Sequence, residues 1–466
     1  MKKYNRRNFL KKTSLSTVAL SSTTFVSSYE SDVKPKESSG GVYMGGYAAP
    51  KIEKLRIAVI GVGGQGRAHA KQFAHIENTE IIAISDLHED LVNQSVSDCI
   101  EKGNGRHQNI ARYYGDENRW KSMLQEVKPD VVIIATNWNN HAPMAIESMK
   151  QGAHAFVEVP LAVTLNELWE IVDTSEQTQK HCMMMENVNY GREELLYLNI
   201  CRNGIIGDLL HGEAAYIHDL RDLFKNEKRG EGVWRPDHHL KRNGNLYPTH
   251  GLGPIAQYMN LSRSEDQFKS IVSYSSPALG AKLYVQKNNP KDQKWNNSDF
   301  RAGDINTSII KTNLGRTIIV QWDEISPRPY SRLNLIQGTK GTLAGYPTRV
   351  ALEGGVLGAT KDSHSWAEGE KLESLFKKYE HPLYLRLGAL AKKMGGHGGM
   401  DFMMRYRIVE CLRKGLPLDQ NVYEGAFWSA VAPLSEASVS QQGMPQQFPD
   451  FTRGNWKNTE PLAIIS

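Results

Sequence analysis

The sequence predicts an α/β protein: an N-terminal doubly wound parallel sheet followed by a C-terminal α+β domain with a largely antiparallel open sheet. Three observations carry this prediction. A glycine-rich turn at residues 61–66 lies between a short apolar run and a segment with helical spacing. Apolar runs and helical segments then alternate up to about residue 187, as in parallel sheets. Beyond that residue, several apolar runs alternate with polar residues and long loops separate them, which is typical of antiparallel sheets.

The glycine-rich turn has the spacing G-x-G-x-x-G, formed by Gly61, Gly63 and Gly66 after a predicted strand at 56–60. In a Rossmann domain the first glycine permits a tight turn and the second lets the backbone approach a pyrophosphate. The third lets the helix pack closely on the strand. Asp86 ends the next predicted strand, where a carboxylate can accept hydrogen bonds from both ribose hydroxyls and repel a 2′-phosphate. The sequence therefore predicts NAD, rather than NADP, as the cofactor.

The remaining elements of this domain follow in alternation. Helices are predicted at 89–103, 120–127, 142–151 and 165–179, and strands at 79–85, 131–136, 153–157 and 182–186. The segment 104–115 is polar and rich in turn residues. A loop at 137–141 follows a strand at the carboxyl edge of the sheet, where open α/β sheets bind ligands.

The second half of the sequence no longer shows strands and helices in regular alternation. It predicts strands at 211–219, 270–275, 307–312 and 317–322, helices at 192–203 and 400–414, and long loops at 220–250 and 286–303. We therefore expect an NAD-binding domain at 52–187 and a substrate-binding domain at 188–466, whose sheet covers the nicotinamide end of the cofactor. An exposed face of that sheet would be a natural homodimer surface.

The N-terminus predicts export. Residues 1–12 read MKKYNRRNFLKK, and the Arg6-Arg7 pair with Asn8-Phe9-Leu10-Lys11 resembles a twin-arginine signal. The mildly apolar, serine- and threonine-rich stretch that follows is too short and too polar to span a membrane. We expect a signal peptide at 1–29, a linker at 30–51, and a periplasmic or extracellular protein.

The composition narrows the range of partners, thiol chemistry and metal sites to be expected. A net charge of +5 over 466 residues, with no basic cluster interleaved with aromatics, indicates no nucleic-acid partner. The four cysteines show no C-x-x-C pairing, and buried, inert thiols are the favoured interpretation. No metal site is expected, because the His238-His239 pair has no recurring ligand spacing.

The residues Glu158-Val159-Pro160 bring in a resemblance to the glucose–fructose oxidoreductase and inositol dehydrogenase superfamily, whose signature is E-K-P. The lysine of that signature is Val159 here. Two further runs, 244–254 (GNLYPTHGLGP) and 395–402 (GGHGGMDF), resemble the NAD-dependent α-N-acetylgalactosaminidases of glycoside hydrolase family 109. This similarity extends from about residue 52 to the C-terminus.

That resemblance implies hydrolysis of terminal α-linked N-acetylgalactosamine by a route outside the usual two-carboxylate scheme. NAD+ would oxidise C3 of the sugar, and the resulting ketone acidifies the proton on C2. The C1–oxygen bond then breaks by elimination, water adds, and the stored hydride returns. No net oxidation occurs, and the cofactor need never leave.

The resemblance also implies site residues. Cofactor contacts fall on Gly64, Gln65, Asp86, Trp138, Asn139, Asn140, His141, Glu158, Val159 and Asn187, beside the three motif glycines. Sugar contacts fall on Tyr216, Arg235, Tyr247, Pro248, Thr249, His250 and Tyr330. Tyr190 is implied as the base at C2, which requires a lowered pKa.

The sequence supports a functional role for His250 more strongly than for His397. His250 has the titration range to take the C3 hydroxyl proton, and Tyr247, three residues earlier, can point into the same site from a rigid turn around Pro248. Both are therefore predicted to be catalytic. His397 stands between two glycine pairs, where a ligand contact and a plain loop histidine are equally consistent with the sequence, so it is not predicted to be a site residue.

Two other functions stay open at this point. One is a sugar or polyol dehydrogenase that exchanges NAD with solvent, and the other is a non-catalytic sugar-binding protein that retains NAD. Val159 in place of lysine and the export signal favour the glycosidase over the dehydrogenase. The presence of Tyr190, Tyr247 and His250 argues against the binding protein.

Overall fold

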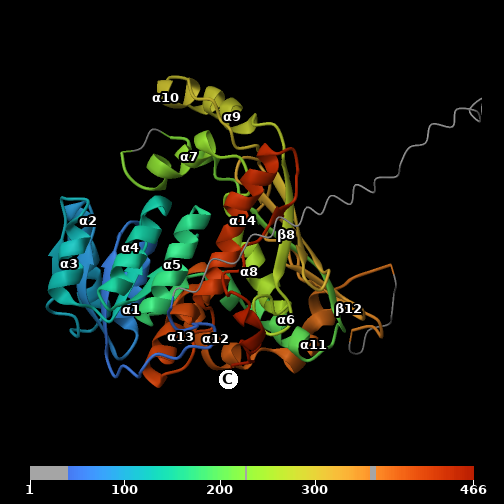
Figure 1. Cartoon of the computed structure of the whole chain (residues 1–466), viewed down its shortest axis with the longest axis horizontal. Helices are drawn as coiled ribbons and strands as arrows, with labels where there is room; N and C mark the ends of the chain where they lie inside the picture. The colour runs from blue at the N-terminus through green and yellow to red at the C-terminus, as the bar shows by residue number, and fades with distance from the viewer. Residues whose placement is uncertain (1–39, 226–227, 357–363, 466) are drawn as a thin grey trace, which may run out of the picture. The chain divides into compact units, whose positions relative to one another are not determined.

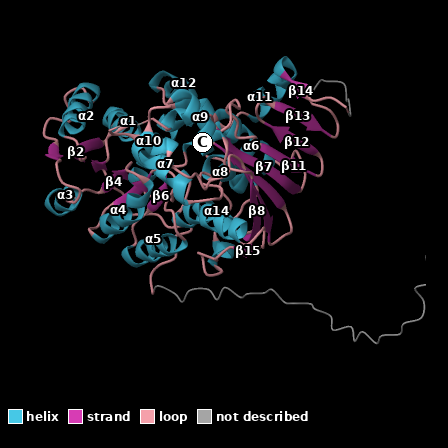
Figure 2. Ribbon diagram, turned by 90° about the horizontal axis from the view of Figure 1, so that it is seen from above, coloured by secondary structure: helices cyan, strands magenta, loops and turns pink. Residues whose placement is uncertain are grey.

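The computed structural model describes residues 40–225, 228–356 and 364–465. All of them belong to one compact unit, Pro35–Ser466. The predicted signal peptide and residues 30–39 of the predicted linker lie outside the described residues. Two sheets organise the described part of the chain, a six-stranded sheet and a nine-stranded sheet (Figure 1, Figure 2).

The first sheet is parallel throughout and has the strand order β3-β2-β1-β4-β5-β6. Its strands are β1 (Leu55–Ile60), β2 (Thr79–Ser85), β3 (Ala111–Tyr113), β4 (Val131–Ile134), β5 (His154–Val157) and β6 (Cys182–Met184). Its helices are α1 (Gly64–His75), α2 (Glu89–Lys102), α3 (Arg119–Val127), α4 (Trp138–Lys150) and α5 (Leu165–Thr178). The strand order reverses between β1 and β4, which is where such sheets bind ligands. The predicted doubly wound fold is confirmed.

The structure differs from the sequence analysis at two places in this half. Strand β3 lies inside the segment 104–115, where no strand was predicted; it is three residues long and pairs with β2. Residues 138–141 are the first turn of α4 rather than a loop, and Asn137 is the N-cap. The carboxyl end of β4 therefore leads directly into a helix N-terminus.

The second sheet has the order β14-β13-β12-β11-β7-β10-β9-β8-β15 and is antiparallel except between β7 and β10. Its strands are β7 (Leu209–Ile217), β8 (Phe268–Ser275), β9 (Asn306–Thr312), β10 (Thr317–Asp323), β11 (Leu335–Gly338), β12 (Gly341–Ala344), β13 (Arg349–Leu352), β14 (Ala367–Glu368) and β15 (Gln446–Gln447). The four predicted strands correspond to β7–β10. The largely antiparallel open sheet is therefore confirmed.

The helices of the second half include several that were not predicted. They are α6 (Arg192–Arg202), α7 (Glu231–Lys241), α8 (Thr249–Tyr258), α9 (Gly280–Asn288), α10 (Gln293–Asn296), α11 (Glu373–Tyr379), α12 (Pro382–Met394), α13 (Met400–Lys414) and α14 (Val422–Ser440). The expected loops 220–250 and 286–303 thus contain α7, α10 and the last residues of α9. The predicted helices at 192–203 and 400–414 are confirmed.

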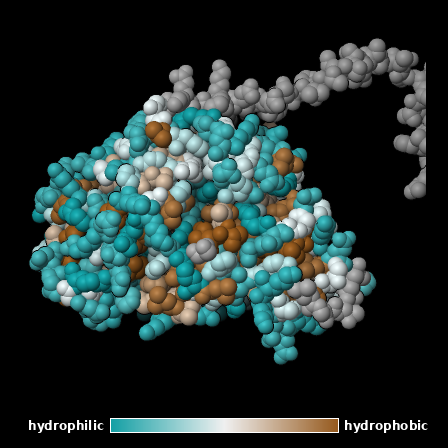
Figure 3. Space-filling model, turned by 90° about the horizontal axis from the view of Figure 1, so that it is seen from below, coloured by the Kyte–Doolittle hydropathy of each residue, from teal (hydrophilic) through white to brown (hydrophobic). Residues whose placement is uncertain are grey.

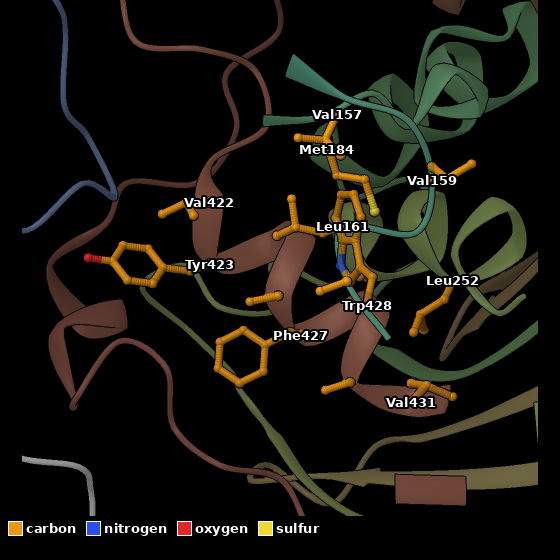
Figure 4. Close-up of a cluster of buried hydrophobic side chains, with 14 of the residues drawn as sticks. Val157, Val159, Leu161, Met184, Leu252, Val422, Tyr423, Phe427, Trp428 and Val431 are labelled. Carbon is orange, nitrogen blue, oxygen red and sulfur yellow. The ribbon is translucent and has the colours of Figure 1, made fainter. Parts of the chain in front are cut away.

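Helix α14 joins the two predicted domains into one core. It packs against α5 and β6 on one side and against β8 on the other. Its Trp428 is fully buried beside Leu161 of the first half (Figure 4), and its Phe427, also fully buried, stacks on Phe268 of the second half, so side chains from both halves pack on this helix. A capping box at Asn421 and Glu424 fixes the start of this helix. Residue 187 therefore marks a change of sheet rather than a boundary between separate cores.

The described part of the predicted linker is not a free connector. The amide of Val42 donates to the carbonyl of Glu176 at 3.0 Å, and the amide of Met44 donates to the Tyr423 hydroxyl at 3.1 Å. Met44 and Ala49 are buried. The apolar residues scattered among the glycines of this segment thus anchor it to α5 and α14.

The surface and the thiols fit the composition. Polar side chains cover most of the face in Figure 3, with separate hydrophobic patches between them. Within the described ranges, no helix has both the length and the apolar composition needed to cross a membrane. All four cysteines are free thiols, and burial raises the pKa of Cys99 and of Cys201 to about 12, which keeps both thiols protonated.

Candidate active-site cleft

A cleft of about 1120 Å³ lies between the carboxyl edge of the first sheet and the end of β7 in the second. On one side it is lined by the glycine loop, Asp86, the first turn of α4 and Glu158. On the other it is lined by Tyr216, Arg235, Tyr247 and His250. The cleft thus brings together most residues predicted to hold the cofactor and most predicted to hold a sugar. It lies at the point where the strand order reverses.

The glycine loop has the space that a dinucleotide requires. A Cβ on Gly63 or Gly64 would meet no heavy atom within 4 Å, and both residues line the cleft. A Cβ on Gly66 would lie 1.8 Å from the carbonyl oxygen of Gly61, so that position tolerates only glycine. Gly61 itself has φ +81°, which favours glycine. The open positions face the site and the crowded one holds helix α1 against β1.

Asp86 is held where a ribose would bind. Its Oδ2 accepts a hydrogen bond from the Val62 amide at 2.8 Å, and its Oδ1 accepts one from the His88 amide at 3.0 Å. The carboxylate is half-buried and lines the cleft beside Gln65. Its remaining lone pairs can accept the ribose hydroxyls, so these residues fit NAD.

The first turn of α4 contributes both residues that line the cleft and a buried histidine, His141, that stabilises it. Trp138 and Asn140 line the cleft, whereas Asn139 is exposed and does not. His141 is buried between two carbonyl oxygens, with Nδ1 2.7 Å from that of Pro160 and Nε2 3.2 Å from that of Thr136. Burial lowers the pKa of His141 and therefore favours the neutral ring. This histidine ties the cofactor side of the cleft to the segment that carries Val159.

Glu158 is linked to a chain of buried polar groups that the sequence did not reveal. Its Oε1 lies 2.6 Å from Nε2 of His69, and Nε of Arg405 donates to Nδ1 of His69 at 2.7 Å. Arg405 also lies 3.7 Å from the carboxylate of Asp401. Asn187 joins the chain by donating to Asp401 Oδ1 at 2.5 Å. Arg405 and Asp401 are buried and do not line the cleft, so they support Glu158 and Asn187, which do.

Glu186 holds the predicted base, His250. The Glu186 side chain is fully buried, and its Oε1 lies 2.7 Å from Nδ1 of His250. The other ring nitrogen, Nε2, lies 3.5 Å from the Tyr247 hydroxyl. Tyr247 and His250 do share one site, but His250 is in the first turn of α8 rather than in a turn around Pro248. Pro248 is the N-cap of that helix and Thr249 is buried, and neither lines the cleft.

Arg235 is held by a buried ion pair. Its Nη2 donates to Oε1 of Glu324 at 2.5 Å, and Nε2 of His239 lies 3.1 Å from the other oxygen of that carboxylate. The guanidinium lies 4.9 Å from the centre of the Tyr247 ring and 5.3 Å from that of Trp138. Arg235 therefore presents a fixed cation against the aromatic wall of the cleft.

Two predicted sugar contacts differ in their relation to the cleft. Tyr216 lines it, and its ring centre lies 4.5 Å from that of Tyr247. Tyr330 does not line it, but lies one ring further out, 6.2 Å from Tyr216 and 5.1 Å from His218. Tyr330 is thus at the rim rather than inside.

The structure does not bring Tyr190 into the cleft, and the prediction that it is the C2 base is corrected. The Tyr190 hydroxyl donates to Asp419 at 3.1 Å within the core. Burial and the Asp419 charge raise the pKa of Tyr190 well above its usual value, the opposite of what a base needs. The side chain packs in the second hydrophobic cluster of the core with Leu195 and Leu383.

His397 is the residue that the sequence left undecided. It lines the cleft, and its side chain is 57% exposed. Its Nδ1 lies 2.9 Å from Oδ2 of Asp401, a contact that raises the pKa of His397 above its usual value. The signal in the sequence was Asp401 four residues later, together with Gly396 and Gly398, which have φ +82° and +73° and shape the loop. Among the residues that the structure describes, no three His, Cys, Asp or Glu side chains are grouped as metal ligands.

Comparisons with known proteins agree with this architecture. The family model described as an oxidoreductase family NAD-binding Rossmann fold matches residues 55–186. The model described as the glycosyl hydrolase 109 C-terminal domain matches residues 190–458. Among solved structures, levoglucosan dehydrogenase in complex with NADH is similar with a TM-score of 0.61 at 16% identity, covering 85% of this chain and 100% of that one. A scyllo-inositol dehydrogenase from Lactobacillus casei with bound NAD(H) has a TM-score of 0.58 at 12% identity, covering 84% and 99%.

Full-length relatives carry the assignment further. The chain is 58% identical over 481 residues to glycosyl hydrolase family 109 protein 1 of Akkermansia muciniphila, covering 99% of each chain. It is 49% identical over 466 residues to a glycosyl hydrolase family 109 protein of Shewanella baltica, covering 100% of each. The predicted resemblance and the predicted NAD cofactor are confirmed. This chain belongs to glycosyl hydrolase family 109, and its first sheet is an NAD-binding Rossmann fold.

Proposed function

We propose that this protein hydrolyses terminal α-linked N-acetylgalactosamine with NAD+ as a resident, self-recycling cofactor. The observation that carries the proposal is the buried Glu186–His250 pair, which lies beside Tyr247 in the same cleft as the glycine loop. Bound NAD+ supplies reversible hydride transfer at C3, which makes the C2 proton acidic enough to pass to water in the open cleft as the C1–oxygen bond breaks. The residues of the cleft supply proton transfer, orientation and charge.

His250 is suited to take the proton of the C3 hydroxyl. Glu186 requires a proton on Nδ1, which leaves Nε2 free toward Tyr247 and the sugar, and it stabilises the imidazolium once Nε2 is protonated. Val159 cannot take part in proton transfer, and it is buried against the hydrophobic core (Figure 4). His250, rather than the residue at position 159, is therefore the group that accepts the C3 hydroxyl proton in this proposal.

His397 is suited to protonate the departing oxygen. Its position on the cofactor side of the cleft and its exposed ring allow contact with a substrate, and Asp401 keeps it protonated at a higher pH than an isolated histidine. Arg235 can fix ring hydroxyls or the acetamido group through its planar donors.

One experiment separates this proposal from its alternatives. The purified full chain is incubated with p-nitrophenyl α-N-acetylgalactosaminide without added cofactor, and nitrophenol and absorbance at 340 nm are recorded. Catalytic release of nitrophenol with no accumulation of NADH supports the glycosidase. NADH accumulation from free sugar and added NAD+ would identify a dehydrogenase instead. Sugar binding with neither reaction would identify a binding protein.

We also propose that the chain is exported through the twin-arginine route, because Arg6-Arg7 leads a short, mildly apolar stretch. Fractionation of a bacterial host should place the mature protein in the periplasm or medium. Replacement of both arginines by lysine should retain it in the cytoplasm with its leader uncleaved. Equal export of that variant would refute this route.

A further inference from the structure

A row of aromatic rings continues from the cleft along the end of the second sheet at which β7 finishes. Tyr216 lines the cleft, and its ring centre lies 6.2 Å from that of Tyr330. Tyr330 in turn lies 5.9 Å from Tyr346, with the two ring planes at 67°. The steps between these rings are comparable with the size of one sugar ring. Tyr346 is not among the residues that the family resemblance implies.

The strand pairing places all three tyrosines at this same end of the sheet. Ile217, at the end of β7, exchanges two backbone hydrogen bonds of 3.0 Å with Ser331, so Tyr330 adjoins the end of β7. Strand β11 runs antiparallel to β7, and β12 runs antiparallel to β11. The chain therefore leaves β12 at Ala344 at the end of the sheet where β7 also ends, and Tyr346 follows two residues later.

Tyr330 and Tyr346 are both accessible to solvent. Tyr330 is 39% exposed and Tyr346 is 37% exposed. Tyr346 also has φ +56°, a left-handed conformation that is rare for a bulky residue and that concentrates at functional sites. Exposure and backbone strain in one residue indicate a role other than packing.

Contacts with Arg332 and Glu193 hold the loop that carries Tyr346 in place. The Arg332 guanidinium lies 5.2 Å from the Tyr346 ring centre and 5.6 Å from that of Tyr330, and it is paired with Glu194 at 2.7 Å. The Thr348 hydroxyl bonds to Glu193. These contacts fix the two rings before any ligand arrives, which lowers the entropy cost of binding.

We propose that Tyr346, together with Tyr330, binds the second sugar of a glycan substrate, the one to which the terminal N-acetylgalactosamine is attached. Aromatic faces bind sugar rings through their C–H surfaces while the ring hydroxyls stay in water, and two rings at a large angle can hold one ring by its face and its edge. This inference rests on the proposed glycosidase function, because it names the part of the substrate that lies outside the cleft.

The test compares two substrates that share the terminal sugar. One is methyl α-N-acetylgalactosaminide, which has no second sugar, and the other is the disaccharide in which the same sugar is α-linked to galactose. Release of N-acetylgalactosamine gives kcat/KM for each, and the ratio of disaccharide to methyl glycoside is the readout. In Tyr346→Asn, which accommodates a positive φ without the ring, we expect this ratio to fall about tenfold, equivalent to about 1.4 kcal/mol.

Two matched variants control the test. Tyr346→Phe keeps the ring and should keep the ratio. Tyr274→Asn removes a 63% exposed tyrosine from β8 of the same sheet, outside the cleft lining, and should also keep it. An unchanged ratio in Tyr346→Asn would overturn the inference. If the wild type hydrolyses neither substrate, the proposed function fails instead, and calorimetric titration with the disaccharide decides the inference: the Kd must be weaker in Tyr346→Asn than in the wild type.

Discussion

Oε1 of Glu186 lies 2.7 Å from Nδ1 of His250, and the carboxylate is buried beneath helix α8. A carboxylate accepts hydrogen bonds, so it selects the tautomer of His250 that carries its proton on Nδ1. The second carboxylate oxygen, Oε2, has no hydrogen-bond partner among the described residues. Since a buried carboxylate without full solvation is costly, its retention next to His250 indicates a role in the reaction.

Glu186→Gln should therefore reduce kcat while the protein stays folded. The amide can still accept from Nδ1, but it no longer stabilises the imidazolium, and it can rotate to favour the wrong tautomer. We expect kcat for p-nitrophenyl α-N-acetylgalactosaminide to fall roughly 10²- to 10⁴-fold. Steady-state kinetics beside thermal denaturation checks this prediction.

Glu176→Gln is the matched control for that variant. Glu176 is also a buried carboxylate, paired with Arg453 and with the Tyr423 hydroxyl, and it lies outside the cleft lining. Its replacement should lower the melting temperature and leave kcat near that of the wild type. Comparable kcat in both variants would show that Glu186 has only a structural role.

The glycine loop offers a pair of substitutions that separate folding from cofactor binding. A Cβ on Gly66 would overlap the Gly61 carbonyl oxygen, so Gly66→Ala should destabilise the protein by about 3 kcal/mol or prevent folding. A Cβ on Gly63 meets only open space, so Gly63→Ala should fold normally but obstruct the pyrophosphate.

The measurements for this pair are the NAD content of the purified protein and its melting temperature after NAD has been removed. Removing NAD matters because a ligand bound to the folded state raises the melting temperature by itself. Gly63→Ala should retain less than about a tenth of the wild-type NAD while its apo melting temperature is unchanged. Full NAD retention in Gly63→Ala would contradict the proposed path of the pyrophosphate.

The cofactor side of the site could be predicted from the sequence because its signals are local. A strand, three glycines and Asp86 lie within 32 residues, and each acts through its own backbone or a single side chain. The alternation of strands and helices likewise depends on short-range periodicity. The missed strand β3 is too short for such a periodicity to show.

The catalytic side could not be predicted in the same way. Glu186 and His250 are 64 residues apart, and Glu158 reaches Arg405 only through His69. The misplacement of Tyr190 has the same origin, because its partner Asp419 is 229 residues away. Long-range packing decides these contacts, and a single sequence does not show it.

The pH dependence of activity should report the His397–Asp401 contact. As a general acid, His397 must be protonated, so kcat/KM falls when the pH rises through its raised pKa. Asp401→Asn removes the carboxylate that raises this pKa, and the alkaline limb should move to lower pH. Activity at pH 8 should fall by roughly three- to tenfold, while activity near pH 5.5 changes less.

Glu410→Gln is the control on the same helix. Glu410 is a largely buried carboxylate paired with Arg386 and Arg407, and it does not line the cleft. Its replacement should leave the alkaline limb in place. The assignment of His397 fails if both variants show the wild-type profile, or if His397→Asn hydrolyses a sugar aglycone as well as the wild type does.

Acid should weaken the fold through Glu324, which holds Arg235. Burial alone would raise the pKa of Glu324, but the charges of Arg235 and His239 outweigh it and lower the pKa to about 2. A depressed carboxyl pKa contributes stability above the unfolded value of about 4.3, and this contribution is lost as the pH falls toward 2. Glu324→Gln leaves a buried guanidinium without its main partner. It should lower the free energy of unfolding by about 3 kcal/mol at neutral pH and raise KM roughly tenfold.

Glu231→Gln distinguishes the buried pair from an exposed one on the same cation. Glu231 contacts Nη1 of Arg235 at 3.1 Å, but its side chain is 53% exposed. Since exposed pairs contribute little, this variant should stay within about 0.5 kcal/mol of the wild type and keep its KM. Denaturant unfolding at pH 7 and pH 3 checks both variants. The difference between the wild type and Glu324→Gln must shrink at pH 3, because there the unfolded wild type is protonated at Glu324 while the folded state, with a pKa of about 2, is still mostly ionised.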